Sequence, residues 1–145
     1  MSVDKFNSEG YYDPTAYEAM STVDKEERAL RAFRPIVYIC SPYAGEIEKN
    51  VKAAQEYSHF AVEKGYIPIA PHLLFPQFLN DANPKERQLG LFFGNALMSK
   101  CSEVWVFGSR ISAGMEAEIN RAKWENYRLR YFTETCEEVH HVRNN

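Results

Sequence analysis

Hydrophobic and polar positions alternate in blocks along most of the chain. Short, continuous apolar runs rich in β-branched and aromatic residues predict strands that are buried on both faces, as in a parallel sheet. Longer segments separate these runs, and in them apolar residues recur every three or four positions, the pattern of amphipathic helices. Four strands are predicted in this way, over residues 36–40, 66–70, 103–108 and 129–133.

Three amphipathic helices are predicted between these strands. The first follows "SPYAGEIEKN" and ends at Gly65, a residue type that often terminates helices. The second spans residues 85–101 and the third spans residues 113–127. The alternation of strand and helix predicts an α/β fold, a mainly parallel sheet with helices on both faces. The side chains of the second helix that we expect to face inward are Leu89, Phe92, Phe93, Ala96 and Leu97.

The N-terminal part of the chain lacks this alternation. Its first fourteen residues are predicted to form an arm, and residues 15–33 form a charged, helix-permissive segment that Pro35 interrupts. The C-terminal residues are polar and are predicted to form at most a last helical turn. We therefore expect an N-terminal arm and helix over residues 1–34, an α/β domain over residues 35–133 and a C-terminal tail over residues 134–145.

The composition fits one globular domain and argues against several classes of function. Of the 145 residues, 45% are hydrophobic and 26% are charged, a balance that is typical of folded domains. The net charge of −3 argues against binding to a nucleic acid polymer, which requires a basic face. No apolar stretch is long enough to span a membrane, and the N-terminus is too polar for a secretory signal.

The three cysteines, Cys40, Cys101 and Cys136, are scattered and form no metal-binding motif. We interpret Cys40 and Cys101 as reduced, buried thiols, because each lies in an apolar stretch. This pattern predicts a cytoplasmic protein that uses no metal and no cofactor.

Ligands of such folds bind beyond the carboxyl ends of the parallel strands, where three loops of this chain would converge. The first loop offers Ser41 for a hydroxyl contact, Tyr43 for stacking on a base or sugar, and Gly45 as its small residue. His72 follows the second strand and is either a structural histidine or a phosphate or sugar contact. For Tyr43, too, a ligand contact and a purely structural role both remain open, because half-buried loop aromatics without a ligand are common.

The third loop leads into the last predicted helix. Ser112 either caps this helix or, together with free backbone N–H groups, binds an anion. Gly114 would let a ligand approach the backbone closely. Met115, the next residue, belongs to the apolar stripe of the helix and is also an expected substrate contact.

Glu118 lies in the same helix, roughly 60° from the centre of its apolar stripe on a helical wheel. Partial burial would raise the pKa of its carboxyl group, whereas the helix N-terminus would favour the charged form. A carboxylate in this balance suits a nucleophile or a polar ligand contact. A half-exposed glutamate paired with Arg121 or a lysine would show the same pattern, so both readings stay open.

Five motifs, in this order, resemble the nucleoside 2-deoxyribosyltransferase-like superfamily, and more closely an uncharacterised branch of it from bacteria, phages and mobile elements. The resemblance covers about residues 35–133 and implies a flavodoxin-like (Rossmann-like) parallel sheet. It also implies cleavage or transfer of the N-glycosidic bond of a (deoxy)nucleoside or its 5′-monophosphate. The motifs are "VYICSPYAGE", "GYIPIAPHLLFP", "QLGLFFGNALMSKC", "EVWVFG" and "ISAGMEAEI".

The resemblance also implies roles for individual residues. Glu118 would be the nucleophile that attacks C1′ of the sugar, while Ser112 and Gly114 would hold the 5′ group. Tyr43 and His72 match the loops after the first and second strands. Asn95 stands in the nearest register to an aspartate that assists the leaving base in active members, and an amide cannot donate an acid proton in the same way.

Three hypotheses follow. The first is an N-glycoside hydrolase or deoxyribosyltransferase, and the second, favoured by Asn95, is a protein that binds or sequesters a nucleotide without turnover. The third is an interaction protein whose N-terminal helix docks a partner. The resemblance further implies a homo-oligomer, because members of the superfamily often complete the site with a neighbouring subunit. The aromatic-rich segment "GYYDPTAY" is a candidate for that contact.

Overall fold

The computed structural model describes residues 22–28 and 33–140. The chain forms two compact units, Met1–Phe33 and Arg34–Asn145. In the first unit, residues 22–28 are helical, in agreement with the helical segment expected there, and Arg28 forms an ion pair with Asp24 one turn earlier at 2.7 Å. The expectations for the arm and for the segment "GYYDPTAY" fall outside the described residues.

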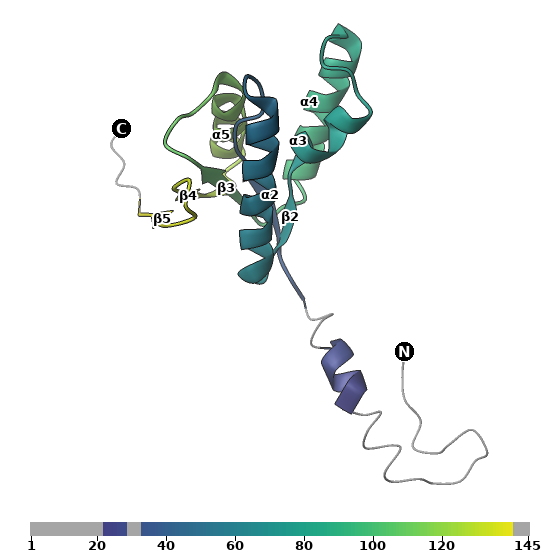
Figure 1. Ribbon diagram of the computed structural model, residues 1–145, viewed down its shortest axis with the longest axis vertical. Coiled ribbons are helices and arrows are strands. Elements are labelled where there is room, and N and C mark those ends of the chain that lie inside the picture. Colours follow the sequence, from purple (N-terminus) through teal and green to yellow (C-terminus); the bar gives the residue numbers. More distant parts are fainter. Residues whose placement is uncertain (1–21, 29–32, 141–145) are drawn as a thin grey trace, which may run out of the picture. The chain divides into compact units, whose positions relative to one another are not determined.

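The second unit is built on a five-stranded sheet (Figure 1). The strands are ordered β2-β1-β3-β4-β5, the first four run parallel, and β5 pairs antiparallel with β4. This arrangement confirms the predicted α/β fold with a mainly parallel, flavodoxin-like sheet. The strand bounds are β1 Ile36–Cys40, β2 Ile67–Ile69, β3 Glu103–Phe107, β4 Arg128–Phe132 and β5 Glu138–Val139.

Helices cover both faces of the sheet because each central strand is buried on both sides. Val37 and Ile39 of β1 pack with Trp105 beneath α2 (Ile47–Glu63), in a cluster that buries Tyr57 and Ala61 of that helix. The alternate residues of β1 belong to a second cluster, beneath α5 (Ala113–Trp124). This second cluster contains Tyr38, Cys40, Met98, Val104, Val106, Met115, Ile119 and Ala122.

Three further helical segments connect β2 to β3. They are α3 (Pro71–Leu74), the 3-10 turn η1 (Phe75–Gln77) and α4 (Pro84–Met98). Asn83 caps α4 by accepting hydrogen bonds from the backbone N–H groups of Lys85 and Glu86. In Figure 1, α4 extends past the ends of the strands.

The predicted inward face of α4 was partly wrong. Leu89 and Ala96 are exposed and Phe92 keeps 66% of its surface in contact with solvent, whereas Gly94 and Met98 are the buried residues of this helix. The reason is geometric, because only one side of the C-terminal half of α4 meets the sheet. An apolar stripe alone cannot tell that side from the outer one.

The C-terminal tail was expected to hold a last helical turn and instead forms a hairpin. Cys136 adopts a left-handed backbone with φ of 65°, and the turn lets β5 pair with β4. Arg130 then fastens the hairpin, because its guanidinium donates to both carboxylate oxygens of Glu138 at 2.8 and 2.7 Å and to buried Glu103 at 3.2 Å. This charge-assisted network selects a strand where sequence pattern shows none.

Candidate functional site

Several of the predicted site residues lie on the loops that follow the parallel strands β1, β2 and β3. In a sheet with this strand order, β1 and β3 flank the point at which the chain changes direction across the sheet, and folds of this kind commonly bind ligands there. Ser41 directly follows β1, and Ser112 directly precedes α5 on the far side of the loop after β3. The topology therefore brings together residues that lie about seventy positions apart.

Glu118 is held by a tyrosine of the sheet. The hydroxyl group of Tyr38, in the middle of β1, donates a short hydrogen bond to Oε2 of Glu118. Tyr38 is only 2% exposed, and its ring belongs to the cluster beneath α5. A Cβ atom added to Gly94 of α4 would lie 3.5 Å from the Tyr38 hydroxyl, so this glycine brings the α4 backbone close to the pair.

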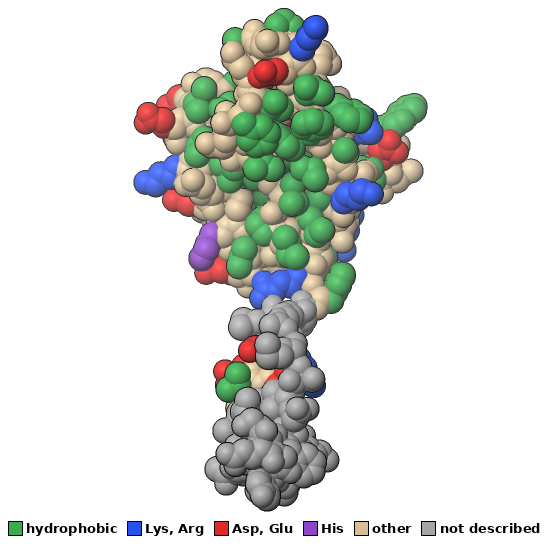
Figure 2. Space-filling model, turned by 90° about the vertical axis from the view of Figure 1, so that its right-hand side faces the viewer, with side chains coloured by type: hydrophobic (Ala, Val, Ile, Leu, Met, Phe, Trp, Pro, Cys, Tyr) green, Lys and Arg blue, Asp and Glu red, His purple; other side chains and the backbone are tan. Residues whose placement is uncertain are grey.

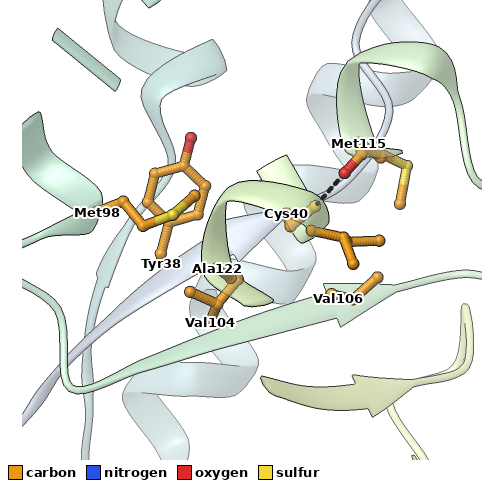
Figure 3. Packing of buried hydrophobic residues seen from close by; sticks show 8 residues of the cluster. Tyr38, Cys40, Met98, Val104, Val106, Met115 and Ala122 are labelled. Atoms are coloured by element: carbon orange, nitrogen blue, oxygen red, sulfur yellow. Dashed lines mark hydrogen bonds between the residues drawn. The ribbon is translucent and has the colours of Figure 1, made fainter. Parts of the chain in front are cut away.

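Cys40 lies two residues further along β1, on the same face as Tyr38. Its thiol donates to the carbonyl oxygen of Met115 at 3.8 Å, as Figure 3 shows, and it also interacts with the carboxylate of Glu118. Two donors from one strand thus approach Glu118. Neither donor is charged, so the carboxylate remains unpaired by any cation among these neighbours.

The ionisation of Glu118 reflects these surroundings. Burial raises the pKa of its carboxyl group, and the hydrogen bonds from Tyr38 and Cys40 partly offset that rise. The same burial, together with the neighbouring carboxylate, raises the pKa of the Tyr38 hydroxyl and the Cys40 thiol, so both keep their protons at neutral pH. The result is a poorly solvated carboxylate next to two neutral donors.

A second group of side chains lies at the start of the loops after β1 and β2. Oγ of Ser41 lies 2.9 Å from Nε2 of His72, and burial lowers the pKa of His72 to about 4. The ring of Tyr43 meets His72 edge-on, with the ring centroids 6.2 Å apart. Asn50 of α2 fixes this loop by donating to the backbone oxygen of Tyr43 at 3.0 Å. His72 is therefore neutral at physiological pH and already hydrogen-bonded.

The loop after β3 ends in a capped helix. Oγ of Ser112 accepts a hydrogen bond from the backbone N–H of Met115 at 3.2 Å, so Ser112 is the N-cap of α5. The Met115 side chain is 1% exposed and packs in the core, and its expected contact with a substrate stays a prediction. Gly114 faces open space, because an added Cβ would meet no atom within 4 Å. Its N–H precedes the first intrahelical hydrogen bonds of α5.

Asn95 and Gly45 lie apart from these contacts. Asn95 is half-buried on α4 next to Gly94, and in the described part of the chain its side chain makes no hydrogen bond to Glu118, Tyr38 or His72. Gly45 is exposed, and its left-handed backbone, with φ of 95°, turns the loop into α2.

Two hollows of the surface lie elsewhere. One, of about 680 Å³, lies along α4. The other, of about 350 Å³, is lined by residues that include Trp105 and Arg130, and Trp105 lies on the face of the sheet that α2 covers, not on the face that α5 covers. Neither is lined by Glu118 or His72. Within residues 22–28 and 33–140, no group of three or more histidine, cysteine, aspartate or glutamate side chains is placed to hold a metal ion. None of the helices in the described segments is both long and apolar enough to cross a bilayer.

A family model for a domain of unknown function, DUF7768, matches residues 35–132, more than half of the chain. The chain belongs to the DUF7768 family. The matched region begins one residue before β1 and ends with β4, so it contains Glu118, Tyr38 and both loops that carry Ser41 and His72. The hairpin strand β5 lies beyond it. No curated protein sequence matches this DUF7768 chain.

The structure of this DUF7768 chain is similar to that of a 2-deoxyribosyltransferase from the psychrotolerant bacterium Bacillus psychrosaccharolyticus. That enzyme is described as a biocatalyst for the synthesis of antiviral and antitumoral nucleosides. The TM-score is 0.55 at 13% sequence identity, over 75% of this chain and 77% of the other. At this identity the likeness shows a shared fold, and it supports the resemblance at that level. The proposed bacterial and phage branch stays a prediction.

Sequence reasoning missed two residues that contact Glu118. The sequence pattern places Tyr38 and Cys40 in a continuous apolar strand and indicates only a reduced, buried thiol for Cys40. A usable signal was present, because a buried tyrosine needs a hydrogen-bond partner, and Tyr38 and Cys40 share one face of a strand by their spacing of two. The sequence alone does not show which helix covers that face of β1.

Proposed function

We propose that this DUF7768 protein cleaves or transfers the N-glycosidic bond of a (deoxy)nucleoside or its 5′-monophosphate, with Glu118 as nucleophile. The single observation that carries the proposal is the part-buried hydrogen bond from the Tyr38 hydroxyl group, in the middle of β1, to the carboxylate of Glu118. A partly buried carboxylate that has no paired cation among the described residues and is oriented by neutral donors costs stability and suits attack on an electrophilic carbon.

The chemistry has two balanced steps. A carboxylate oxygen of Glu118 bonds to C1′ while the C1′–N bond breaks, and the base leaves with the bonding electron pair and takes a proton from solvent water. Water or a second base then attacks C1′ and gives up its proton to solvent, and the electron pair of the C1′–O bond returns to Glu118, which regenerates the carboxylate. The hydrogen bond from Tyr38 occupies Oε2 and fixes the orientation of the group throughout.

The proposed substrate contacts follow from the surrounding loops. Gly114 and the start of α5 offer backbone N–H groups to a 5′-phosphate or 5′-hydroxyl, with open space where a side chain would stand. Ser41, His72 and Tyr43 offer a hydroxyl, a neutral imidazole and an aromatic face to the sugar and base. Gly45 gives the same loop its turn. We also propose a cytoplasmic homo-oligomer that uses no cofactor.

A second candidate is nucleotide binding without turnover. It is favoured by the shortage of an acid for the departing base, since Asn95 is an amide, His72 is neutral and Tyr38 holds its proton tightly. Such a protein would use the same loops to retain an intact nucleotide.

Base release separates the two candidates. Purified protein is incubated with nucleosides, 5′-monophosphates and NAD-like dinucleotides, and free base is followed by chromatography for the wild type, Glu118→Gln and Glu116→Gln. We expect one substrate class to yield base, with a loss of about a thousandfold or more in Glu118→Gln. Glu116, exposed on the same helix, serves as the matched control and should retain activity. Thermal stabilisation by a nucleotide that stays intact would favour binding without turnover.

A further inference from the structure

The loop that follows β3, residues 108–112, is held to the C-terminal hairpin by one carboxylate. Oε2 of Glu134 accepts hydrogen bonds from the backbone N–H of Ser109 at 3.1 Å and from the Ser109 hydroxyl at 3.0 Å. The same oxygen lies over Gly108, since a Cβ added there would stand 3.6 Å from it. Gly108 has a left-handed backbone with φ of 99°, so Glu134 contacts the chain where it turns out of β3.

Little else holds this loop between its two ends. Among the residues that the structure describes, Ser109, Arg110 and Ile111 make no hydrogen bond other than the two to Glu134. Ile111 is 45% exposed, so apolar packing adds little. The shape of the loop between Gly108 and the cap of α5 therefore depends on Glu134.

The hairpin turn that carries Glu134 is held by its own hydrogen bonds. The Thr133 hydroxyl accepts from the backbone N–H groups of Thr135 and Glu137 at 3.3 and 3.1 Å. The backbone N–H of Thr133 in turn donates to the carbonyl oxygen of Glu137 at 2.9 Å, and Arg130 closes the base of the hairpin. The hairpin is thus the support and the loop is the part that it orders. This turn lies beyond the matched DUF7768 region, which ends at residue 132.

Hydrogen bonds, rather than apolar contacts, make the connection between hairpin and loop. Figure 2 looks onto the side of the molecule that carries α3 and α4 and shows hydrophobic side chains gathered there. The hairpin of β4 and β5 lies at the other end of the sheet (Figure 1), and its turn begins with Thr133, Glu134 and Thr135. Packing would therefore not compensate for loss of the Glu134 carboxylate.

We propose that Glu134 is a positioning residue that holds the loop of residues 108–112 in the shape that binds substrate. The inference rests on the proposed function, in which the start of α5, directly after this loop, contacts the 5′ group. A loop that is already ordered loses less conformational entropy when the substrate binds, so binding is tighter. The hydrogen bonds from Ser109, above all from its backbone N–H, lower the pKa of the Glu134 carboxyl group, so it is an ionised acceptor at neutral pH.

Amide hydrogen exchange of the free protein tests the positioning without any substrate. Glu134→Ala should speed exchange in peptides that cover residues 108–112 by roughly three- to tenfold, as expected when a hydrogen bond to an amide is lost. Glu134→Gln, whose side-chain oxygen can still accept from Ser109, should restore most of the protection. Glu137→Ala is the matched control, because the Glu137 carboxylate contacts Thr135 within the hairpin and should leave the loop unchanged. Unaltered exchange in Glu134→Ala would overturn the inference, whether or not the protein is an enzyme.

Kinetics on the substrate class that releases base test the consequence for binding. Glu134→Ala should raise KM roughly three- to tenfold and leave kcat within about twofold, because the reacting group, Glu118, is untouched. Ser109→Ala removes one of the two donors, so it should raise KM less and add little to Glu134→Ala.

A protein that binds a nucleotide without turnover should show the same loss in Kd. An unchanged KM or Kd in Glu134→Ala, or a fall in kcat alone, would overturn the inference. If no nucleoside or nucleotide is cleaved or bound, the proposed function fails, and the exchange measurement still decides whether Glu134 positions the loop.

Discussion

At the scale of the residue, Glu118 occupies surroundings that disfavour its own charge. Its neighbours Tyr38 and Cys40 are neutral and buried, and no cation compensates the carboxylate among these contacts. Burial and hydrogen bonding act on its pKa in opposite directions, and burial is the stronger effect. A position of this kind lowers the stability of the fold, and such costs concentrate at functional sites.

We predict that Glu118→Gln raises the melting temperature at neutral pH. Because the folded pKa of Glu118 lies above its unfolded value, the native state binds more protons, so its contribution to stability falls as pH rises through the folded pKa. The amide removes this loss and can still accept from Tyr38. Thermal unfolding at pH 7 and at pH 4 should show a gain that shrinks at the lower pH, and the exposed Glu116→Gln should show none. A lower melting temperature at pH 7 would contradict this account.

His72 should give the folded protein the opposite pH dependence of stability. Its folded pKa of about 4 lies below the ordinary value of 6.5, so the unfolded state binds more protons between these values. Stability is then lost as pH falls from 6.5 to 4, by on the order of 3 kcal/mol for a shift of this size. His72→Gln, which retains a partner for Ser41, should flatten that part of the denaturation profile, whereas His59→Gln on exposed α2 surface should leave it unchanged. An unaltered profile in His72→Gln would show that a group other than His72 causes the loss of stability at low pH.

At the scale of the element, α5 begins at a cap that also borders the site. The Ser112 side chain satisfies the N–H of Met115, whose carbonyl oxygen accepts from Cys40, so the start of α5 is tied to the end of β1. This connection orients Glu118 one turn further along the helix. A change in the cap should therefore affect both stability and the site.

We predict that Ser112→Ala lowers the free energy of unfolding by about 1 kcal/mol, whereas Ser112→Asp, which can still cap, lowers it much less. Chemical denaturation of the three proteins measures the difference. If Ser112 contacts an anionic 5′ group, Ser112→Asp should nevertheless weaken nucleotide binding through charge repulsion. Equal stability of the Ala variant and the wild type would show that the cap contributes little.

The hydrophobic pattern predicted most elements correctly, because the central strands are covered on both faces and the helices that cover them pack one face against the sheet. The strands β1 and β3 are buried on both faces, and α2 and α5 each have one apolar stripe that meets the sheet. It failed for α4, whose outer side is apolar without being covered within the chain. It failed for β5, a two-residue strand that depends on the ion pair between Arg130 and Glu138.

The candidate site could likewise be predicted only in part from the sequence. The position of Glu118 beside an apolar stripe and the capping role open to Ser112 follow from helical spacing, and both agree with the structure. The contact with Tyr38 does not follow, because it depends on which face of β1 lies beneath α5. The contact between Ser41 and His72 depends likewise on the path of a loop thirty residues away.

At the scale of the whole molecule, the parallel sheet unites these contacts. The strand order places β1 between β2 and β3, and the loops after β1, β2 and β3 supply Ser41, His72 and Ser112 to one edge. Glu118 approaches the same strand from α5. Because Glu118 is the proposed nucleophile, the most direct measurement is of a covalent bond between Glu118 and the sugar.

That measurement is the intact mass of the protein after incubation with a 2′-fluoro-arabinosyl nucleoside, whose fluorine slows the loss of sugar from a glycosyl-enzyme. The account predicts release of the base, a gain in protein mass equal to that of the fluorinated sugar residue, and peptide mapping of the added mass to Glu118. Glu118→Gln should show neither the base nor the mass gain. An unchanged mass during base release, or a sugar attached to another residue, would contradict the assignment of Glu118 as nucleophile.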